Sequence, residues 1–180
     1  MTKKRKTNSV TNIKAALIDL LLEMEYSKIT IGNITQRANV SRGTFYQHFL
    51  DKDDLAYSIG TETMQRFWEI LAQGNLDKED MLLKALLLIK NDYKHFKAIS
   101  KAPHVQFKDK VQQLICDLIN NNPAIREKIK KKTKISDEIV IKAFSTSFET
   151  IISSWIDNDL SESPEKVVDN IIKIEQLFWK

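Results

Sequence analysis

The chain has 180 residues, of which 42% are hydrophobic and 29% are charged, and its formal net charge is +4. This length suits one domain, or a small domain followed by a larger one, with a sizeable core. The single cysteine, Cys116, excludes a disulfide framework within one chain, and the longest apolar stretch, residues 81–89, is too short to span a bilayer. With only four glycines and three prolines, an all-α, soluble, cytoplasmic protein is expected.

Positive charge is concentrated at the N-terminal end. Residues 1–50 contain eight Lys or Arg and three Asp or Glu, a net charge of +5, whereas the remaining residues contain twenty and twenty-one, a net charge of −1. Such asymmetry predicts an anionic partner at this end of the molecule, nucleic acid or a membrane surface. The first residues form a basic arm that comprises Lys3, Lys4, Arg5 and Lys6. For this arm taken alone, a solvated tail and a contact with an anionic partner are equally good interpretations.

Helical spacing is clear in the first segment. Apolar residues recur at intervals of three and four from Ile13 to Met24, which predicts a helix with one apolar face over residues 10–24. A short helix is expected at residues 31–38, where Thr30 can act as the N-cap.

A sharp turn and a second short helix follow. Asn39 is expected in the turn, because asparagine adopts a positive φ more readily than most residues that carry a side chain. Ser41 can cap the second short helix, and Asp51 can cap a longer helix that runs to about residue 73. Two short helices joined by a tight turn are the helix-turn-helix geometry.

The middle of the chain is also expected to be helical. A strongly apolar helix over residues 77–96 is predicted at the centre of a bundle, and a further helix between Pro103 and Pro123. The lysine-rich segment 128–134 is interpreted as a solvated face or loop rather than a second nucleic-acid site.

Two long helices close the chain, starting at Ser136 and Ser163, and each carries a bulky apolar stripe. The stripes can dock onto a symmetry mate as a four-helix bundle, or onto the core of the same chain. The candidates for a dimer interface are Phe144, Phe148, Ile151, Trp155, Ile171, Ile174 and Phe178.

The stretch SRGTFYQHF, residues 41–49, gathers polar groups around two phenylalanines. Phe45 and Phe49 lie four residues apart, so both can anchor a short helix from one face. The other face can read bases in a DNA major groove, because Arg and Gln offer paired hydrogen bonds to guanine and adenine and glycine permits close approach. The base-reading candidates are Arg42, Gly43 and Gln47. Donors near the helix starts suit phosphate oxygens. The phosphate candidates are Thr30, Ser41, Thr44, Tyr46, His48 and Lys52.

The run at residues 29–55, ITIGNITQRANVSRGTFYQHFLDKDDL, resembles the DNA-binding domain of the TetR family of bacterial transcriptional regulators. It contains the T-F-Y, H-F and K-x-x-L elements at the family spacing. Asn39 replaces the usual turn glycine and Thr35 stands where alanine is common. Asparagine accepts the turn and threonine costs only helix propensity, so both departures are compatible with DNA binding.

The resemblance implies a homodimer that places the second short helix of each subunit in successive major grooves of a pseudo-palindromic operator. It implies about nine helices in two domains. Residues 1–55 form the DNA-binding domain, and its basic arm reaches the DNA backbone or minor groove. Residues 56–180 form a helical domain that contains the effector pocket and the dimer face. A repressor released by a small molecule is the leading hypothesis. The alternative is a regulator, such as an activator, whose C-terminal domain binds a protein coregulator.

The last third is similar, more weakly, to a subgroup that regulates dihydroxyacetone kinase genes with a protein coregulator, through WIDND at residues 155–159 and SPE at residues 163–165. Candidates for the pocket are aromatic or amphipathic residues near the central helices, namely Phe67, Trp68, Tyr93, Phe96, His104 and Phe107. No metal, cofactor or membrane partner is expected, and no enzyme, since neither metal-ligand spacing nor a phosphate loop or nucleophile motif occurs.

Overall fold

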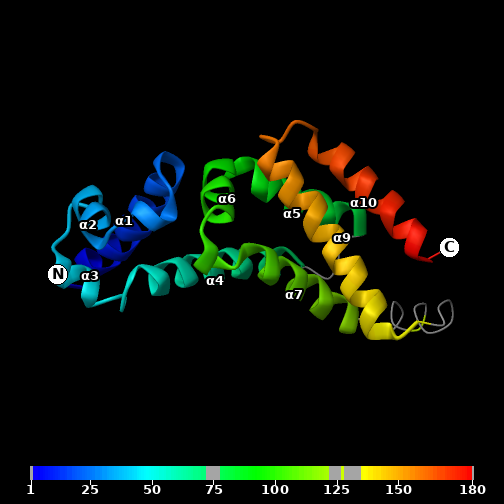
Figure 1. The fold of residues 1–180 in the computed structure, drawn as a ribbon, viewed down its shortest axis with the longest axis horizontal. Helices are drawn as coiled ribbons and strands as arrows, with labels where there is room; N and C mark the ends of the chain where they lie inside the picture. The colour runs from blue at the N-terminus through cyan, green and yellow to red at the C-terminus, as the bar shows by residue number, and fades with distance from the viewer. Residues whose placement is uncertain (1, 72–77, 122–126, 128–134, 180) are drawn as a thin grey trace. The chain divides into compact units, whose positions relative to one another are not determined.

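The computed structural model of the chain describes residues 2–71, 78–121, 127 and 135–179, apart from the side chains of residues 2–7, 71, 78, 178 and 179. Within these ranges it contains nine α-helices, two short 3-10 helices and no strand (Figure 1). The predicted all-α fold is therefore confirmed. The predicted loop at residues 128–134 and the predicted helix ends near residue 73 and at Pro123 lie outside the described residues.

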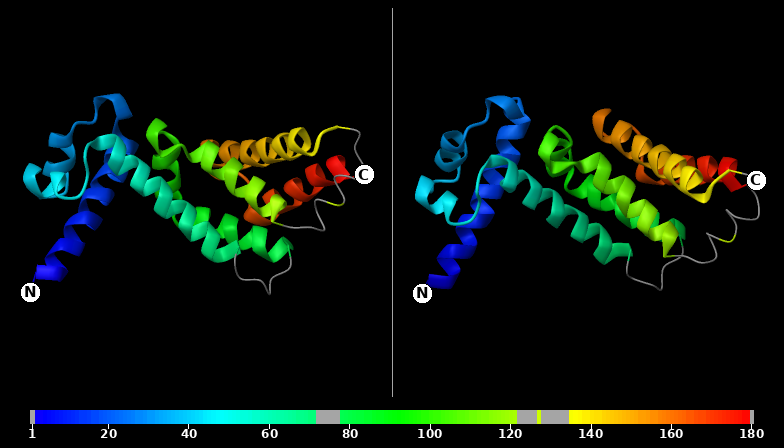
Figure 2. Two further views of the ribbon diagram at one scale, coloured as in Figure 1. Left: turned by 90° about the horizontal axis from the view of Figure 1, so that it is seen from below. Right: turned by 60° about the horizontal axis from the view of Figure 1, so that its bottom comes forward.

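The chain forms two compact units. The first unit comprises Met1–Gln65 together with Asp92–Phe107, and the second comprises Arg66–Asn91 together with Lys108–Lys180. Helix α4, Lys52–Leu71, runs without interruption from residues of the first unit into residues of the second (Figure 2). The division predicted from the sequence separates a DNA-binding domain, residues 1–55, from an effector-binding and dimerisation domain, residues 56–180. This division by function stays a prediction.

The first unit is built around the apolar face of α1. Ile13 and Leu17 on this face are fully buried, as are Ile34 of α2 and Phe96 of α6. Helix α6 packs against α1, and so does α2. The elements of this unit, besides the start of α4, are α1 (Thr2–Glu23), η1 (Tyr26–Lys28), α2 (Ile31–Arg37), α3 (Arg42–Tyr46), α6 (Tyr93–Ser100) and η2 (Pro103–Val105).

The second unit is a helical bundle. Helix α10 packs against both α5 and α9 (Figure 2). Ser136 caps α9 as predicted, since its side chain accepts a hydrogen bond from the Ile139 N–H. Between the last two helices, the indole N–H of Trp155 donates to the Glu162 carbonyl at 2.9 Å and holds the connection. Besides the end of α4, the helices of this unit are α5 (Lys78–Asn91), α7 (Phe107–Asn120), α9 (Asp137–Asp157) and α10 (Pro164–Trp179).

The prediction of a single helix over residues 77–96 is wrong. The helix is interrupted at Asp92, which separates α5 from α6. Asp92 has φ −122° and ψ 39°, outside the helical region. The two pieces belong to different cores: α5 packs against α10, whereas α6 packs against α1. Phe96 of α6 is fully buried, with its ring 6.1 Å from that of Phe107. Packing on separate cores therefore overrides a helical pattern that continues through the sequence.

Candidate DNA interface and C-terminal cavity

Thr30 caps the start of α2, as the sequence predicted, and the structure shows that the cap is reciprocal. The Thr30 hydroxyl oxygen accepts a hydrogen bond from the Asn33 N–H at 3.1 Å, and the Asn33 Oδ1 accepts one from the Thr30 N–H at 2.9 Å. This capping box satisfies backbone donors that the start of a helix leaves without partners. Thr30 is exposed at the helix start, where a phosphate contact is expected.

The turn between α2 and α3 depends on Asn39. Its φ is 51°, in the left-handed region, which confirms the expected conformation. The Val40 N–H donates to the Thr35 carbonyl at 3.0 Å and the Asn39 N–H to the Gln36 carbonyl at 3.2 Å. These two bonds form the Schellman pattern that commonly ends a helix. The direction in which α3 leaves α2 is therefore fixed by backbone hydrogen bonds.

Replacing Asn39 with alanine is expected to lower the free energy of unfolding by about 1 kcal/mol, because alanine tolerates the left-handed region less well than asparagine. Glycine at the same position is the matched control, since it adopts this conformation without steric cost. Urea unfolding of both variants followed by circular dichroism tests the difference. Equal stability of the alanine variant and the unmodified protein would contradict the role given to this turn.

Helix α3 has only five residues and is held by its buried face. Phe45 is fully buried, and its ring lies 5.8 Å from the ring of Phe49. Ser41 caps the helix, because its hydroxyl oxygen accepts a hydrogen bond from the Thr44 N–H at 3.0 Å. The structure brings the three base-reading candidates together as exposed residues on and directly after this helix, and these are Arg42, Gly43 and Gln47.

The Arg42 guanidinium lies against the first turn of α2. A Cβ built on Gly32 would come 3.2 Å from the Arg42 Nη2 and 3.4 Å from the Thr30 Oγ1. The absent side chain at Gly32 thus leaves room for the guanidinium beside a phosphate candidate. Gly32 is not among the candidates predicted from the sequence. The usable signal is a glycine within a short helix, where alanine would be more favourable.

Lys52 joins the start of α4 to the segment before α2. Its ammonium donates to the carbonyl oxygens of Tyr26 at 2.7 Å and Ile29 at 2.8 Å, and lies 4.1 Å from the centre of the Tyr26 ring. An ammonium has three N–H donors, so one remains for a phosphate oxygen. The predicted phosphate candidate therefore also has a structural role that the sequence did not indicate.

Tyr26 and Asp53 form a pair that the sequence did not indicate. The Tyr26 hydroxyl donates to the Asp53 Oδ1 at 2.5 Å, and the His104 Nε2 lies 3.5 Å from the Asp53 Oδ2. Partial burial, the hydrogen bond and the nearby carboxylate charge raise the pKa of Tyr26 far above its ordinary value. The phenol therefore stays protonated and remains a donor to Asp53 throughout the physiological pH range.

The other phosphate candidates differ in exposure. Tyr46 is 56% exposed, whereas Thr44 and His48 are half-buried, and the His48 ring lies 6.3 Å from that of Phe49. Ser41 is exposed and also lies within hydrogen-bond distance of the Thr44 hydroxyl, at 2.9 Å. The side chains of the basic arm lie outside the described residues, although the backbone there continues α1, and the arm comprises Lys3, Lys4, Arg5 and Lys6.

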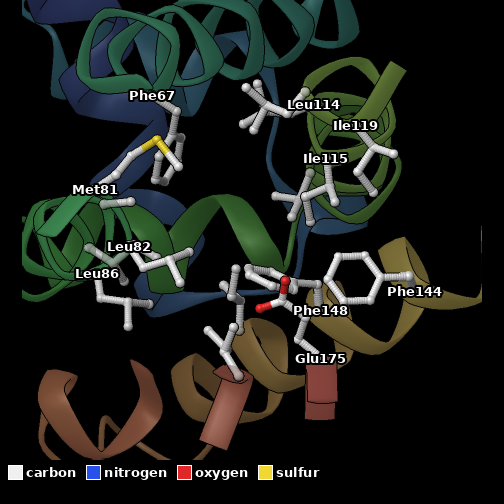
Figure 3. Close-up of a pocket in the computed structure, with 16 residues that line it drawn as sticks. Phe67, Met81, Leu82, Leu86, Leu114, Ile115, Ile119, Phe144, Phe148 and Glu175 are labelled. Atoms are coloured by element: carbon white, nitrogen blue, oxygen red, sulfur yellow. The ribbon is translucent and has the colours of Figure 1, made fainter. Parts of the chain in front are cut away.

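The second unit contains a cavity of about 140 Å³ (Figure 3). Its described lining consists of fifteen apolar residues, from α4, α5, α7, α9 and α10, and one polar residue, Glu175 of α10. An apolar cavity of roughly 150 Å³ is known to hold a molecule the size of benzene. The cavity is therefore suited to an apolar ligand or an apolar part of one.

The pocket candidates are divided between the units. Phe67 lines the cavity, and the other five do not. Phe96 and Phe107 are buried against each other in the first unit, His104 is exposed beside Asp53, and Tyr93 belongs to the same unit. The remaining candidate, the half-buried Trp68, is next to Phe67 in the sequence but does not contribute to the lining.

Most of the dimer-interface candidates are used inside the protomer. Phe144, Phe148 and Ile171 line the cavity and are 9% exposed or less, and Trp155 is 4% exposed. Such residues leave little surface for a second chain, which matches the alternative that the stripes dock onto their own core. The half-buried Ile151 and Ile174 keep part of their surface open. The side chain of Phe178, the remaining candidate, lies outside the described residues.

In the part of the chain that the structure describes, no helix combines the length and the apolar character needed to cross a membrane. The His, Cys, Asp and Glu side chains of the same residues form no group of three or more that could hold a metal ion.

Two family descriptions match the sequence. Residues 13–59 match "Bacterial regulatory proteins, tetR family", and residues 77–176 match "Transcriptional regulator C-terminal region" of the same family. The "Fatty acid metabolism regulator protein" of Bacillus subtilis (strain 168) is 22% identical over 174 residues, which cover 87% of this chain and 88% of that protein.

Solved structures share the fold over nearly the whole chain. The fatty acid degradation regulator FadR from Bacillus halodurans has a TM-score of 0.68 at 19% identity, covering 94% of this chain and 97% of that one. The dihydroxyacetone kinase operon activator DhaS has a TM-score of 0.62 at 21% identity, covering 95% and 96%. Both parts of the chain match descriptions of this family, and the structure contains a helix-turn-helix followed by a helical C-terminal part. The protein is therefore a TetR-family transcriptional regulator.

Proposed function

We propose that the protein is a repressor that binds a pseudo-palindromic operator as a homodimer and leaves it when a small apolar effector binds. The observation that carries the operator half of this proposal is the exposed row Arg42, Gly43 and Gln47 above the buried Phe45. A short helix anchored on one side and rich in donors on the other fits the major groove, where base edges present distinct donor and acceptor patterns.

Phosphate contacts are proposed to flank this helix. Thr30, Ser41 and Tyr46 are exposed, and the first two sit at helix starts, where the helix dipole favours an anion. These contacts position the protein on DNA without reading sequence. Lys52 adds a charge whose remaining N–H can reach a phosphate oxygen.

Replacing Lys52 with alanine is expected to weaken binding to all DNA sequences similarly. It should also reduce the slope of log affinity against log salt by about one, because a single lysine–phosphate pair is removed. Lys101→Ala is the matched control, because it removes one exposed charge from the same unit. Fluorescence anisotropy over a salt series measures both. An unchanged slope for the Lys52 variant, with its helical content intact, would leave this lysine with a structural role alone.

The effector half of the proposal is supported by the cavity in the second unit. Its lining is almost entirely apolar. One relative in sequence is named for fatty acid metabolism, and one structure with the same fold is named for fatty acid degradation; each matches most of this chain, which favours an effector with an alkyl portion. An effector can bind the operator-free form of the protein more tightly than the operator-bound form. The factor between these two effector affinities is then the factor by which the effector lowers the affinity for the operator.

Mapping bound DNA across the genome, followed by mobility-shift assays on the recovered site, tests the whole proposal. We expect a site with two half-sites about one helical turn apart, occupied by two chains and released by a small apolar molecule. A monomer on a single half-site would contradict the dimer. Release or stabilisation only by a partner protein would instead support the alternative, a regulator that works with a protein coregulator.

A further inference from the structure

We propose that Gly32 contributes to operator specificity as a positioning residue, because its missing side chain leaves the space in which the Arg42 guanidinium is held. This role depends on the proposed function, since Arg42 is taken there to read bases. It adds a determinant of sequence reading that lies on α2, outside the helix that carries Arg42.

The backbone of Gly32 does not require a glycine. Gly32 is the second residue of α2, and no glycine in the described residues has a positive φ. Alanine in an ordinary helical conformation stabilises a protein relative to glycine, because the unfolded chain has less conformational freedom to lose. Glycine at this position therefore lowers stability, and the surroundings of the missing Cβ offer a compensating reason.

The end of the Arg42 side chain occupies the space beside Gly32. A Cβ built on Gly32 would come 3.2 Å from the Arg42 Nη2, which is closer than most side-chain carbons approach a neighbour, and 3.4 Å from the Thr30 Oγ1. Thr30 is held by its reciprocal hydrogen bonds with Asn33, whereas Arg42 is exposed and long. A side chain at residue 32 would therefore displace the guanidinium rather than the threonine.

The turn between α2 and α3 fixes the other end of this contact. Arg42 is the first residue of α3, and it follows the Ser41 cap and the turn at Asn39, whose φ is 51°. The Phe45 N–H donates to the Ser41 carbonyl at 3.1 Å, and the Phe45 ring is fully buried. The backbone at residue 42 is thus held in place, and only the arginine side chain can give way.

Holding the guanidinium favours base reading. A long side chain loses conformational freedom when it binds, and a side chain that is already restrained loses less. A bidentate pair with guanine also requires the planar fork at a defined position. A displaced guanidinium keeps its charge, so its attraction to phosphates persists while its discrimination between bases falls.

The test selects bound DNA from a pool of duplexes with about 30 random base pairs, enough for two half-sites one helical turn apart. Fluorescence anisotropy then measures the selected site and its single-base changes. Gly32→Ala should lower discrimination about two- to fivefold at the base pair that Arg42 reads, where one bidentate pair supplies roughly 5- to 150-fold. Binding to unrelated DNA should stay unchanged. Gly32→Leu, whose side chain extends further, should remove most of the discrimination.

Stability should change in the opposite direction. Gly32→Ala should raise the melting temperature by about 1–4 °C. Thr61→Ala is the matched control, because Thr61 is exposed on α4, is not proposed to contact DNA, and also gains helix propensity as alanine. It should leave discrimination unchanged. An equal loss of discrimination in this control would attribute the effect to stabilisation and overturn the role of Gly32.

A double-mutant cycle shows whether Gly32 acts through Arg42. In the Arg42→Ala background, Gly32→Ala should have no further effect on discrimination, because no guanidinium remains to be displaced. Equal losses in both backgrounds would mean that residue 32 meets the DNA itself and would overturn the proposal. Unchanged or improved discrimination by Gly32→Ala alone would overturn it too, and the proposed function would stand if Arg42→Ala still relaxed the preference. A protein that selects no sequence from the pool would overturn both.

Discussion

Replacing Phe45 with alanine is expected to lower the free energy of unfolding of the first unit by about 3–5 kcal/mol, the range for removing a fully buried phenylalanine. Phe45 is 0% exposed and contacts the rings of Tyr46 and Phe49. Helix α3 has only five residues, and Phe45 is the one that it buries. Operator binding should be lost together with α3, even where the second unit stays folded.

Hydrogen exchange and urea unfolding measure this effect, with exchange showing whether the amides of α2 and α3 lose protection first. Tyr46→Phe is the matched control. It removes a hydroxyl from an exposed ring next to Phe45 and should leave stability nearly unchanged while weakening operator binding. Retained protection of α3 in the Phe45 variant would show that the helix does not depend on this ring.

The second large effect is expected for Arg42. Arg42→Ala should cost about 1–3 kcal/mol of operator affinity and relax the preference at one base pair, because alanine cannot make the bidentate hydrogen bonds to guanine. Arg42 is exposed and its guanidinium lies beside Gly32 at the start of α2, so the side chain can be removed without opening the core. Stability should therefore remain close to that of the unmodified protein.

Arg42→Lys separates base reading from charge. Lysine keeps the positive charge but lacks the planar fork, so it should retain non-specific affinity and lose much of the discrimination. Competition binding against operators with each base pair changed in turn measures this. If the lysine variant discriminated as well as arginine at every position, Arg42 would have to be reassigned to a phosphate contact.

The local features of the helix-turn-helix could be predicted from the sequence. The caps at Thr30, Ser41 and Asp51 are each made within three residues along the chain, so a short window contains both partners. The positive φ of Asn39 is also a property of one residue in a turn. The predicted start of the first helix at residue 10 is wrong, because α1 begins at Thr2. The prediction followed the apolar face, which starts later in the sequence than the helix itself.

Features that depend on distant residues could not be predicted in the same way. The hydrogen bonds from Lys52 to Tyr26 and Ile29 join residues more than twenty positions apart, and no periodic pattern connects them. The cavity illustrates the same limit. Residue type predicts aromatic residues as its lining, yet Phe96 and Phe107 fill a core together while aliphatic residues such as Leu86 and Ile115 surround the space. Which core positions leave a gap is decided by packing, which single-sequence patterns do not contain.

The path of the chain affects how the protein can be divided. Residues 92–107 follow α5 in the sequence but complete the first unit, where α6 packs against α1. A chimaera that joins residues 1–55 to the C-terminal part of another regulator would lose the native partner of this α1 face, and exposing apolar surface costs about 25 cal/mol per Å². Residues 1–55 are therefore not expected to fold stably when they are transferred alone to another protein, and a chimaera should also include residues 92–107.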